Sequence, residues 1–338
     1  MPLGRLASRL HSFSLTGVRI LVTGGAGFIG SNYVRWVLAN TDDTIVVYDA
    51  LTYAGNRSTL RDVDDDPRYD FVKGDICDPA PLTDAMRGCD AVVHFAAESH
   101  VDRSIEGSDD FVITNCFGTN VVMDTARRLG IERVVHIGTD EVYGSVEVGS
   151  SREGDPLEPR SPYSASKAGS DLLALSYHAT HGLDVRVTRC TNNFGPYQYP
   201  EKAIPLFTTN LLEGRPIPLY GDGLNERDWI HVDDHCAGVH LVLTDGEPGE
   251  IYNIGAGNET PNRVLVDKLL ALTGRDESLV TYVEDRLGHD RRYSVDITKI
   301  TGLGWQRQRT LDEALEATVA WYRDNEWWWK PLRDGTAP

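Results

Sequence analysis

Tyr163 and Lys167 are the pair of polar residues whose types and spacing most clearly suggest chemistry. Residues four positions apart on a helix share a face. The ammonium group of Lys167 can therefore lie near the phenol of Tyr163 and lower its pKa by favouring the phenolate. Such a base is suited to taking a proton from a sugar or alcohol hydroxyl while a hydride leaves the same carbon atom. The pair predicts an oxidation at a hydroxyl-bearing carbon.

A second polar cluster, Thr139-Asp140-Glu141, follows an apolar segment that we expect to be a strand. Neighbouring side chains at the end of a strand point in different directions. One carboxyl group could then act as an acid and the other as a base on different atoms of one substrate. For Asp140 to be the acid near neutral pH its pKa must be raised, and burial and the charge of Glu141 both act in that direction. The cluster indicates that oxidation is only the first step.

A glycine-rich turn near the start of the chain predicts a dinucleotide site. The apolar segment 18–23 runs into Gly24-Gly25-Ala26-Gly27-Phe28-Ile29-Gly30. Glycines allow a tight turn and a close approach of the backbone to a pyrophosphate at a helix N-terminus. A second apolar segment, 44–48, ends in Asp49 at the spacing typical of an acid that binds the adenosine ribose. Its carboxylate would repel a 2′-phosphate, which favours NAD over NADP, and Asp75 could reach the adenine amino group.

The composition is that of an ordinary globular protein. The chain has 338 residues, of which 41% are hydrophobic and 25% charged, enough for one large domain or two coupled ones. No apolar run reaches the length of a transmembrane helix, and the net charge of −18 argues against nucleic acid and membranes as partners. The five cysteines have the spacing of neither a disulfide framework nor a zinc site. We therefore expect reduced cysteines, no metal and a cytoplasmic protein.

Strand-like and helix-like segments alternate through the first half of the chain, which predicts an α/β fold with a Rossmann-like doubly wound parallel sheet. We expect strands at 18–23, 44–48, 69–73, 90–96, 132–138 and 184–190. We expect helices at 28–40, 79–87, 109–129, 161–181 and 310–324.

Three regions are expected along the chain. Residues 1–16 form a short N-terminal tail without the features of a signal peptide, and residues 17–190 form the NAD-binding domain. Residues 191–332 are mainly a smaller, interleaved substrate-binding region, from which late strands such as 229–232 and 251–254 return to the sheet. Trp327-Trp328-Trp329 should anchor the C-terminal segment by packing.

The glycine-rich turn together with Tyr163 and Lys167 resembles the extended short-chain dehydrogenase/reductase superfamily. Within it, the sequence is similar to the dTDP-glucose 4,6-dehydratase family from about residue 18 to 332. The segments that carry this resemblance are 94–102, 139–144, 192–198, 227–229 and 288–293. Gly138, Phe194 and Leu287 stand where the family often has Ser or Thr, Tyr and Pro, and none of these positions supplies a reacting group.

The resemblance implies that dTDP-glucose is converted to its 4-keto-6-deoxy form, with tightly bound NAD regenerated in each turnover. Tyr163 would take the proton of the C4 hydroxyl as NAD⁺ accepts the C4 hydride. Lys167 would also hold the nicotinamide ribose, and Thr139 would bond the oxygen at C4. Glu141 would then remove the C5 proton and Asp140 would protonate the leaving C6 hydroxyl, before hydride returns to C6.

The resemblance and the chemistry of the side chains also give the expected binding residues. For the cofactor these are Tyr163, Lys167, Gly24, Gly27, Phe28, Ile29, Gly30, Asp49, Leu51, Thr52, Asp75, Ile76, Ala96, Ala97, Ser99, Thr114 and Asn192. For the substrate they are Thr139, Asp140, Glu141, Ser99, His100, Asn192, Lys202, Pro218, Tyr220, Arg227, Asn262, His289, Arg292 and Tyr293. Among them, Lys202, Arg227 and Arg292 are cations that could neutralise the diphosphate.

The helices expected at 109–129 and 161–181 carry more apolar residues than packing on one sheet should need. Examples are Val121, Val122, Leu172, Leu173 and Leu175. In the similar family such helices form a four-helix dimer interface. We therefore expect a homodimer.

Three alternatives stay open from the sequence. A UDP-sugar 4-epimerase or a UDP-glucuronate decarboxylase would share the fold, NAD and the Tyr163/Lys167 pair, but neither needs Asp140 as an acid for C6. A GDP-mannose 4,6-dehydratase is closer in chemistry, although its expected NADP preference does not suit Asp49. A non-catalytic dinucleotide sensor would tolerate loss of the reacting residues, all of which are present. The mass of the product distinguishes the enzymes.

Overall fold

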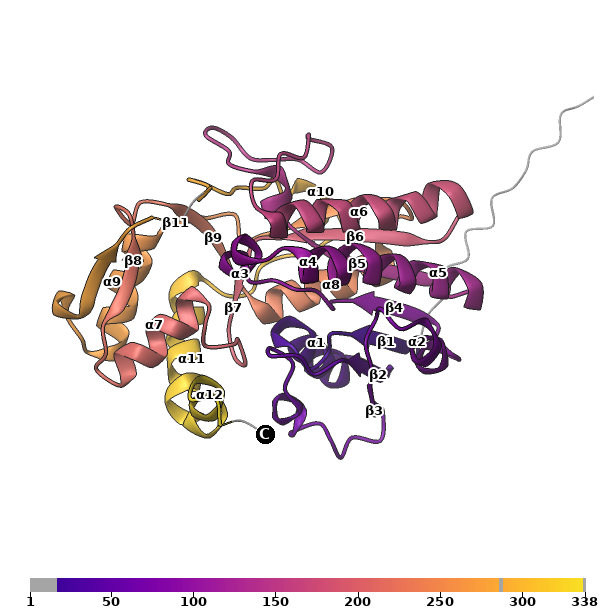
Figure 1. Ribbon diagram of the computed structural model, residues 1–338, viewed down its shortest axis with the longest axis horizontal. Helices are drawn as coiled ribbons and strands as arrows, with labels where there is room; N and C mark the ends of the chain where they lie inside the picture. Colours follow the sequence, from indigo (N-terminus) through magenta and orange to yellow (C-terminus); the bar gives the residue numbers. More distant parts are fainter. Residues whose placement is uncertain (1–16, 286–287, 337–338) are drawn as a thin grey trace, which may run out of the picture.

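A seven-stranded parallel sheet lies at the centre of the molecule (Figure 1). The computed structural model describes residues 17–285 and 288–336, so the expected tail at 1–16 and Leu287 lie outside the described residues. The strand order is β10-β6-β5-β4-β1-β2-β3. These strands are β1 (Arg19–Thr23), β2 (Thr44–Asp49), β3 (Tyr69–Lys73), β4 (Ala91–His94), β5 (Arg133–Thr139), β6 (Val185–Cys190) and β10 (Ile251–Ile254). The order reverses between β1 and β4, and ligands bind at such a switch point.

Helices cover both faces of this sheet. On one face lie α1 (Phe28–Asn40) and α8 (Val232–Asp245); on the other lie α2 (Pro79–Met86), α5 (Thr119–Leu129) and α6 (Pro162–His181). Alternate strand residues point to opposite faces, so Ile20 and Val22 pack with α1 while Leu21 packs on the other side. Because both faces are covered, the strands read as continuous apolar runs.

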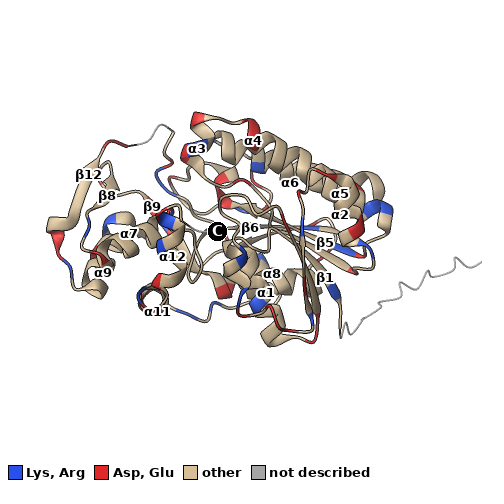
Figure 2. Cartoon of the chain, turned by 60° about the horizontal axis from the view of Figure 1, so that its bottom comes forward, with Lys and Arg blue, Asp and Glu red and all other residues tan. Residues whose placement is uncertain are grey.

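The helix α6 has clear local determinants in the sequence. The side chain of Ser161 caps its first turn in a capping box with Ser164, and Pro162 occupies the first turn. Gly182 ends the helix in the left-handed conformation (φ +70°). Its only charged residues, Lys167 and Asp171, are both buried, and most of the helix is uncharged in Figure 2.

The segment expected as one helix at 109–129 is divided into three parts. These are α4 (Asp109–Phe111), the π-helix η2 (Val112–Gly118) and α5. The wide turn of η2 places the side chain of Asn115 inward, where it accepts a hydrogen bond from the Glu98 N–H (2.9 Å) and donates one to Ser166 Oγ (2.8 Å). The helix α3 (Val101–Glu106) precedes this segment.

A smaller region with its own core packs beside the sheet. Its strands are β7 (Asn192–Phe194), β8 (Ile217–Tyr220), β9 (Glu226–His231), β11 (Glu259–Pro261) and β12 (Val280–Val283), in sheets of order β11-β9-β7 and β12-β8. Its helices are α7 (Ala203–Leu212), α9 (Asn262–Thr273), α11 (Leu311–Asp324) and α12 (Glu326–Arg333). The shorter elements of the chain are η1 (Arg57–Leu60), η3 (Asp140–Tyr143), η4 (Glu277–Leu279) and α10 (Thr298–Gly302).

The predicted fold class is confirmed, with differences in the late segments. Residues 251–254 form β10 and pair with β6 in the main sheet, whereas 226–231 form β9 and pair with β7 and β11 outside it. The helix α8 also returns to the main sheet. The division of the chain at residue 190 stays a prediction.

Packing of the expected C-terminal anchor and of the proposed dimer helices differs in detail from expectation. Trp328 and Trp329 are buried and pack with Tyr322, so the predicted packing is confirmed for these two residues. Trp327 is exposed, so the prediction is wrong for it. Val121 and Val122 were expected to contribute to a dimer face, but both are buried in the core under the sheet, so that part of the prediction is wrong.

All five cysteines are free thiols. Burial raises the pKa of Cys190 to about 12, so this group stays protonated. Within the described part of the chain, none of the helices combines the length and the apolar character needed to span a bilayer.

Candidate active site

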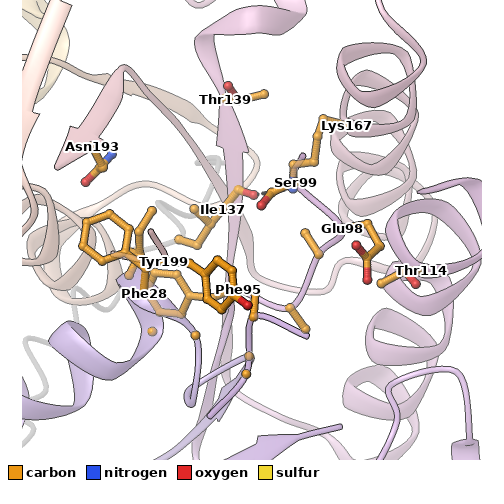
Figure 3. A pocket seen from close by; sticks show the side chains of 18 of the residues that line it. Phe28, Phe95, Glu98, Ser99, Thr114, Ile137, Thr139, Lys167, Asn193 and Tyr199 are labelled. Atoms are coloured by element: carbon orange, nitrogen blue, oxygen red, sulfur yellow. Dashed lines mark hydrogen bonds between the residues drawn. The ribbon is translucent and has the colours of Figure 1, made fainter. Parts of the chain in front are cut away.

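A cavity of ≈ 330 Å³ opens at the carboxyl ends of the central strands, where the connections that follow β1 and β4 run to opposite faces of the sheet (Figure 3). It is lined by the glycine-rich turn, the ends of β2 and β5, the first turns of α6 and the segment 190–202. The glycine-rich turn, Tyr163, Lys167 and the Thr139-Asp140-Glu141 cluster thus line one cavity.

The glycine-rich turn has the geometry of an anion-binding site. Gly24 is left-handed (φ +69°), and a Cβ atom there would lie 2.6 Å from the backbone nitrogen of Ala96. A Cβ on Gly30 would collide with the carbonyl oxygen of Gly24. Gly27 precedes α1, whose first residues, Phe28 and Ile29, line the cavity. The turn therefore brings backbone and the N-terminus of a helix to the cavity wall, as binding of a pyrophosphate requires.

Asp49 closes β2 and ties the glycine-rich turn to the next loop. Its carboxylate accepts hydrogen bonds from the N–H groups of Ala26 (2.9 Å) and Leu51 (2.8 Å). Burial raises the pKa of Asp49, and these two hydrogen bonds oppose that rise. Asp49 and Asp75 both line the cavity, but Leu51 does not. The two acids predicted to bind the adenosine thus line the same cavity as the glycine-rich turn, and their binding roles stay predictions.

Tyr163 and Lys167 are both buried in the first turns of α6. Lys167 Nζ donates a 2.6 Å hydrogen bond to the carbonyl oxygen of Ile137. Burial, followed by the charge of Glu141, raises the pKa of Tyr163 well above its usual value, while a hydrogen bond with Thr139 acts in the opposite direction. The net lowering predicted for the Tyr163 pKa is therefore not found in this arrangement, because burial and then the charge of Glu141 raise it.

Asp140 and Glu141 diverge at the end of β5. Thr139 is extended, and its hydroxyl accepts a hydrogen bond from the Glu141 N–H (3.3 Å) as η3 begins. Asp140 is 3% exposed, whereas Glu141 is only partly buried. Burial, then the charges of Glu141 and Asp228, raise the pKa of Asp140 well above its usual value, which is the expected direction. Asp140 Oδ2 has no hydrogen-bond partner among the described residues, so a protonated Asp140 has a donor to offer.

Sixteen of the expected cofactor-binding residues line the cavity, and Leu51 is the one that does not. Of the expected substrate-binding residues, six line it: Ser99, Thr139, Asp140, Glu141, Asn192 and Lys202. His289 and Arg292 line a second cavity of ≈ 620 Å³ together with Arg160, Glu226 and Arg291. The remaining expected substrate contacts line neither cavity: His100, Pro218, Tyr220, Arg227, Asn262 and Tyr293.

Part of this last group clusters nevertheless. The rings of Tyr220 and His289 lie 6.1 Å apart, and the guanidinium of Arg227 lies 4.4 Å from the centre of the Tyr293 ring. Burial and then the charge of Glu141 raise the pKa of Tyr293, which places Tyr293 within electrostatic reach of the acid pair.

The three cations expected to bind phosphate all contact protein oxygen atoms. Lys202 Nζ donates to the Ser99 carbonyl (2.7 Å), and the buried Arg227 donates to the Asp290 carbonyl (2.9 Å). Arg292 pairs with Glu259 at 3.1 Å. Each would have to share or exchange these partners to bind a diphosphate.

Sequence reasoning missed several lining residues. They include Tyr48, Gly55, Phe95, Glu98, Asn193, Gln198, Tyr199 and Glu201. Phe95 and Glu98 lie in the segment 94–102 that carries the family resemblance, and Asn193 follows Asn192, so a signal was present for these. Gln198 lies in the segment 192–198 that carries the same resemblance, and Tyr48 precedes Asp49 on β2, so a signal was present for these as well. Gly55, Tyr199 and Glu201 lie in loops whose paths the sequence does not specify.

The residues present fit a dinucleotide better than a metal. The glycine-rich turn offers close backbone contact, because Gly24 and Gly30 leave no room for side chains. Polar atoms come from Asp49 at the end of β2 and from two buried oxygens without a hydrogen-bond partner among the described residues, Asn192 Oδ1 and Asn193 Oδ1. Within 17–285 and 288–336, no group of three or more His, Cys, Asp or Glu side chains could hold a metal ion.

The family whose model matches this chain and a highly similar relative are both named as 4,6-dehydratases. Residues 21–318 match the protein family described as GDP-mannose 4,6 dehydratase. A dTDP-glucose 4,6-dehydratase of Streptomyces antibioticus is 57% identical over 324 residues, covering 94% of this chain and 96% of that protein.

Solved structures similar to this chain include a dTDP-glucose 4,6-dehydratase and, at lower identity, an epimerase. DesIV, a dTDP-glucose 4,6-dehydratase of Streptomyces venezuelae solved with NAD and dTDP bound, superimposes with a TM-score of 0.92 at 58% identity, covering 93% of this chain and 100% of its own. A UDP-glucose 4-epimerase of Thermus thermophilus, solved with NAD, gives a TM-score of 0.85 at 30% identity, over 91% and 100% of the two chains. The chain belongs to the GDP-mannose 4,6-dehydratase family and, within it, to the dTDP-glucose 4,6-dehydratases.

Proposed function

We propose that this chain converts dTDP-glucose to dTDP-4-keto-6-deoxyglucose, with NAD as a cofactor that is regenerated in each turnover. The observation that carries this proposal is the buried Asp140, whose pKa is raised by burial and then by the charges of Glu141 and Asp228, beside the partly buried Glu141. This pair lines the same cavity as Tyr163 and Lys167. An acid and a base next to an oxidation site are what a dehydratase needs and what an epimerase does not need.

The cofactor would be held by the wall of the cavity that carries the glycine-rich turn. Gly24, Gly27 and Gly30 would contact the pyrophosphate, Asp49 the adenosine ribose and Asp75 the adenine. NAD bound there supplies a hydride acceptor for C4 and a hydride donor for C6. The carboxylate of Asp49, fixed by the Ala26 and Leu51 N–H groups, supports NAD over NADP.

Oxidation at C4 falls to the residues on α6 and at the end of β5. Tyr163 takes the proton of the C4 hydroxyl, while Thr139 bonds the same oxygen. Lys167, whose Nζ donates a hydrogen bond to the Ile137 carbonyl oxygen, would favour the phenolate of Tyr163 and hold the nicotinamide ribose. The resulting ketone acidifies the hydrogen on C5.

Elimination falls to the acid pair. Glu141 removes the C5 proton, Asp140 gives its proton to the C6 hydroxyl, and the C6–O bond breaks to release water. Glu141 would return its proton to C5 as hydride returns to C6. The proton that Tyr163 took from the C4 hydroxyl would then replace, through the site or the solvent, the proton that Asp140 gave to water, so all three residues regain their starting protonation states. General acid–base catalysis of this kind contributes about 10²–10⁴-fold, so both carboxyl groups should be essential at useful rates.

The nucleotide part of the substrate would extend toward the second cavity. Lys202 and Asn192 line the first cavity, and His289 and Arg292 line the second. Arg227, Arg292 and Lys202 are proposed diphosphate ligands, with Tyr220, Pro218 and His289 against the base. The remaining proposed contacts are His100, Asn262 and Tyr293.

The proposal is tested by supplying dTDP-glucose deuterated at C4, without any added reductant. Loss of one water molecule from the sugar, with the deuterium recovered on C6, is expected. An epimerase would leave the mass unchanged, and a decarboxylase would act only on a glucuronate and release carbon dioxide. Product of unchanged mass, from folded enzyme containing NAD, would exclude the dehydratase assignment.

We further propose a homodimer whose interface is formed by η2 and α6. Val112, Ile113 and Phe117 on η2 and Leu172 on α6 are exposed apolar residues, and contacts join η2 with α6. Exposed apolar residues gathered on adjacent helices are typical of an interaction surface. The five free cysteines suit a reducing compartment, which supports a cytoplasmic location.

A further inference from the structure

Arg189 is a fully buried cation on β6, next to the strand that leads into the acid pair. It is 2% exposed, and its register partners are Gly138 on β5 and Asn253 on β10. Paired residues of neighbouring strands point to the same face of a sheet. A Cβ at position 138 would lie 2.9 Å from Asp171 Oδ1, so Gly138 leaves the space in which Arg189 meets α6.

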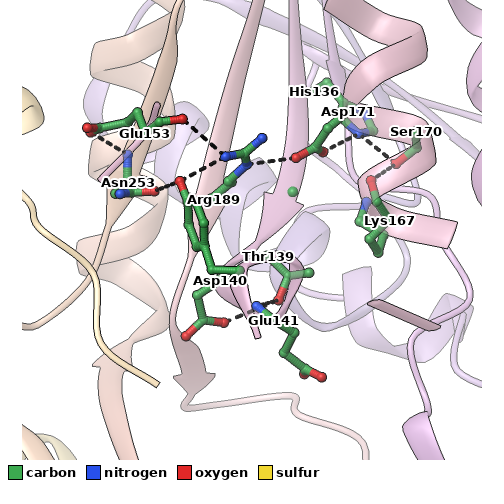
Figure 4. A network of polar contacts seen from close by, with 12 residues as sticks. His136, Thr139, Asp140, Glu141, Glu153, Lys167, Ser170, Asp171, Arg189 and Asn253 are labelled. Atoms are coloured by element: carbon green, nitrogen blue, oxygen red, sulfur yellow. Dashed lines mark hydrogen bonds and ion pairs between the residues drawn. The ribbon is translucent and has the colours of Figure 1, made fainter. Parts of the chain in front are cut away.

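The guanidinium joins two elements that carry different parts of the site (Figure 4). Its Nε donates to Asp171 Oδ2 on α6 (2.9 Å), and its Nη1 donates to the hydroxyl of Tyr143 at the end of η3 (2.8 Å). The Arg189 Cζ lies 4.8 Å from the centre of the Tyr143 ring. The Tyr143 hydroxyl in turn donates to Asn253 Oδ1 (2.9 Å).

Each of these elements holds one pair of reacting groups. Asp171 lies one helical turn after Lys167 on α6, and Tyr143 is the last residue of η3, which begins with Asp140 and Glu141. His136 Nε2, on β5, lies 3.3 Å from the other oxygen of Asp171. The buried carboxylate is thus held between two strands and a helix.

We propose that Arg189 is a positioning residue for the elimination step, fixing η3 against α6 through Tyr143 and Asp171. This inference rests on the proposed function. Reacting groups must be held close to their productive geometry, and a displacement of about 1 Å can cost about a hundredfold in rate. Asp140 and Glu141 must address C6 and C5 of the same sugar whose C4 is oxidised beside Tyr163. The link through Arg189 sets that relation.

The variant Tyr143→Phe tests the link with the smallest change. It keeps the ring and the Arg189–Asp171 pair but removes the hydroxyl through which Arg189 holds η3. Loss of water should become about ten- to a hundredfold slower, while oxidation of C4 stays at the wild-type rate. The dTDP-4-keto-hexose that still holds its C6 hydroxyl should then accumulate before the steady state. Rapid quenching into borodeuteride followed by mass analysis measures it.

A matched control is Tyr252→Phe. Tyr252 lies on β10 and is also buried. Its hydroxyl accepts a hydrogen bond from the N–H of Glu247 (2.8 Å), which precedes that strand. Its loss removes one buried tyrosine hydroxyl without touching η3 or α6. The two steps should keep their wild-type ratio of rates in this variant, whatever happens to its unfolding midpoint.

A second variant, Arg189→Lys, covers the case in which Tyr143→Phe fails to fold. An ammonium group can pair with Asp171 but lacks the planar fork that reaches Tyr143 as well, so the same separation of steps is expected. Water loss at the wild-type rate, or equal slowing of both steps, would overturn the inference. If the wild-type enzyme itself releases no water from dTDP-glucose, the proposed function fails instead, and this is measured first.

Discussion

Replacing Asp140 with Asn separates the two properties that the structure gives this residue. Asn has nearly the same shape as Asp but cannot ionise or donate an acidic proton. Asp140 is 3% exposed and its pKa is raised by burial and by the charges of Glu141 and Asp228. The variant should therefore fold and hold NAD, oxidise C4, and release water about 10²–10⁴-fold more slowly.

The same raised pKa predicts how stability changes with pH. Above the pKa of the unfolded chain, about 3.9, the native state holds one proton more than the unfolded state until pH reaches the native pKa of Asp140. The stability that the protonated group contributes is complete below the unfolded value and is lost as pH rises through that window. Relative to Asp140→Asn, the free energy of unfolding of the wild type should fall by at most about 1.4 kcal/mol per pH unit.

Urea unfolding of both proteins over a series of pH values upward from about 4, the pKa of the unfolded chain, measures this difference. Product mass at each pH measures water loss. A stability difference that does not change with pH would mean that Asp140 is ionised in the native protein. Wild-type turnover by Asp140→Asn would remove its role as the acid.

Three further predictions concern other parts of the molecule. Tyr163→Phe should abolish C4 oxidation, since the phenol that takes the proton is gone. No reduced nicotinamide absorbance should appear with dTDP-glucose, and its appearance would reassign the base. Asp49→Ala removes the acceptor of the Ala26 and Leu51 N–H groups, so NAD should bind about tenfold more weakly. Calorimetric titration with NAD and NADP checks this, and unchanged discrimination between them would contradict the role of the carboxylate. Leu172→Glu places a charge on an exposed apolar residue of α6 and should shift the protein from dimer to monomer in light scattering. An unchanged mass would exclude this face.

Local sequence signals determined much of the Rossmann-like part. The helix at 28–40 was predicted with the observed bounds, because the glycine-rich turn before it leaves few alternatives. The sequence predicted that Ile251–Ile254 returns to the main sheet, but not that it pairs with β6 or in which register. The partner strand lies about sixty residues earlier, and apolar segments alone do not specify which residues pair.

The proposed dimer surface shows why hydrophobic periodicity alone does not identify exposed apolar residues. Of the residues that the sequence suggested, Val121 and Val122 are core whereas Leu172 is exposed, and the sequence did not suggest the exposed Val112, Ile113 and Phe117. A π-helix has an extra residue in its turn, and each residue rotates the following positions by about 100°. The turn η2 therefore changes which residues of the later helix face the sheet, and no capping or turn residue in the sequence marks it.

The acid pair is the part of the site in which sequence and structure complement each other most directly. Two adjacent carboxyl groups can serve as acid and base only if their surroundings differ, and residue types alone do not say which is which. The extended backbone at Thr139, followed at once by the tight turn η3, directs Asp140 into the protein and leaves Glu141 partly buried. The charge of Glu141 then helps to keep Asp140 protonated. The charge of the base, Glu141, thus favours the protonated form of the acid, Asp140. Glu141→Gln should therefore slow both the removal of the C5 proton and the protonation of the C6 hydroxyl.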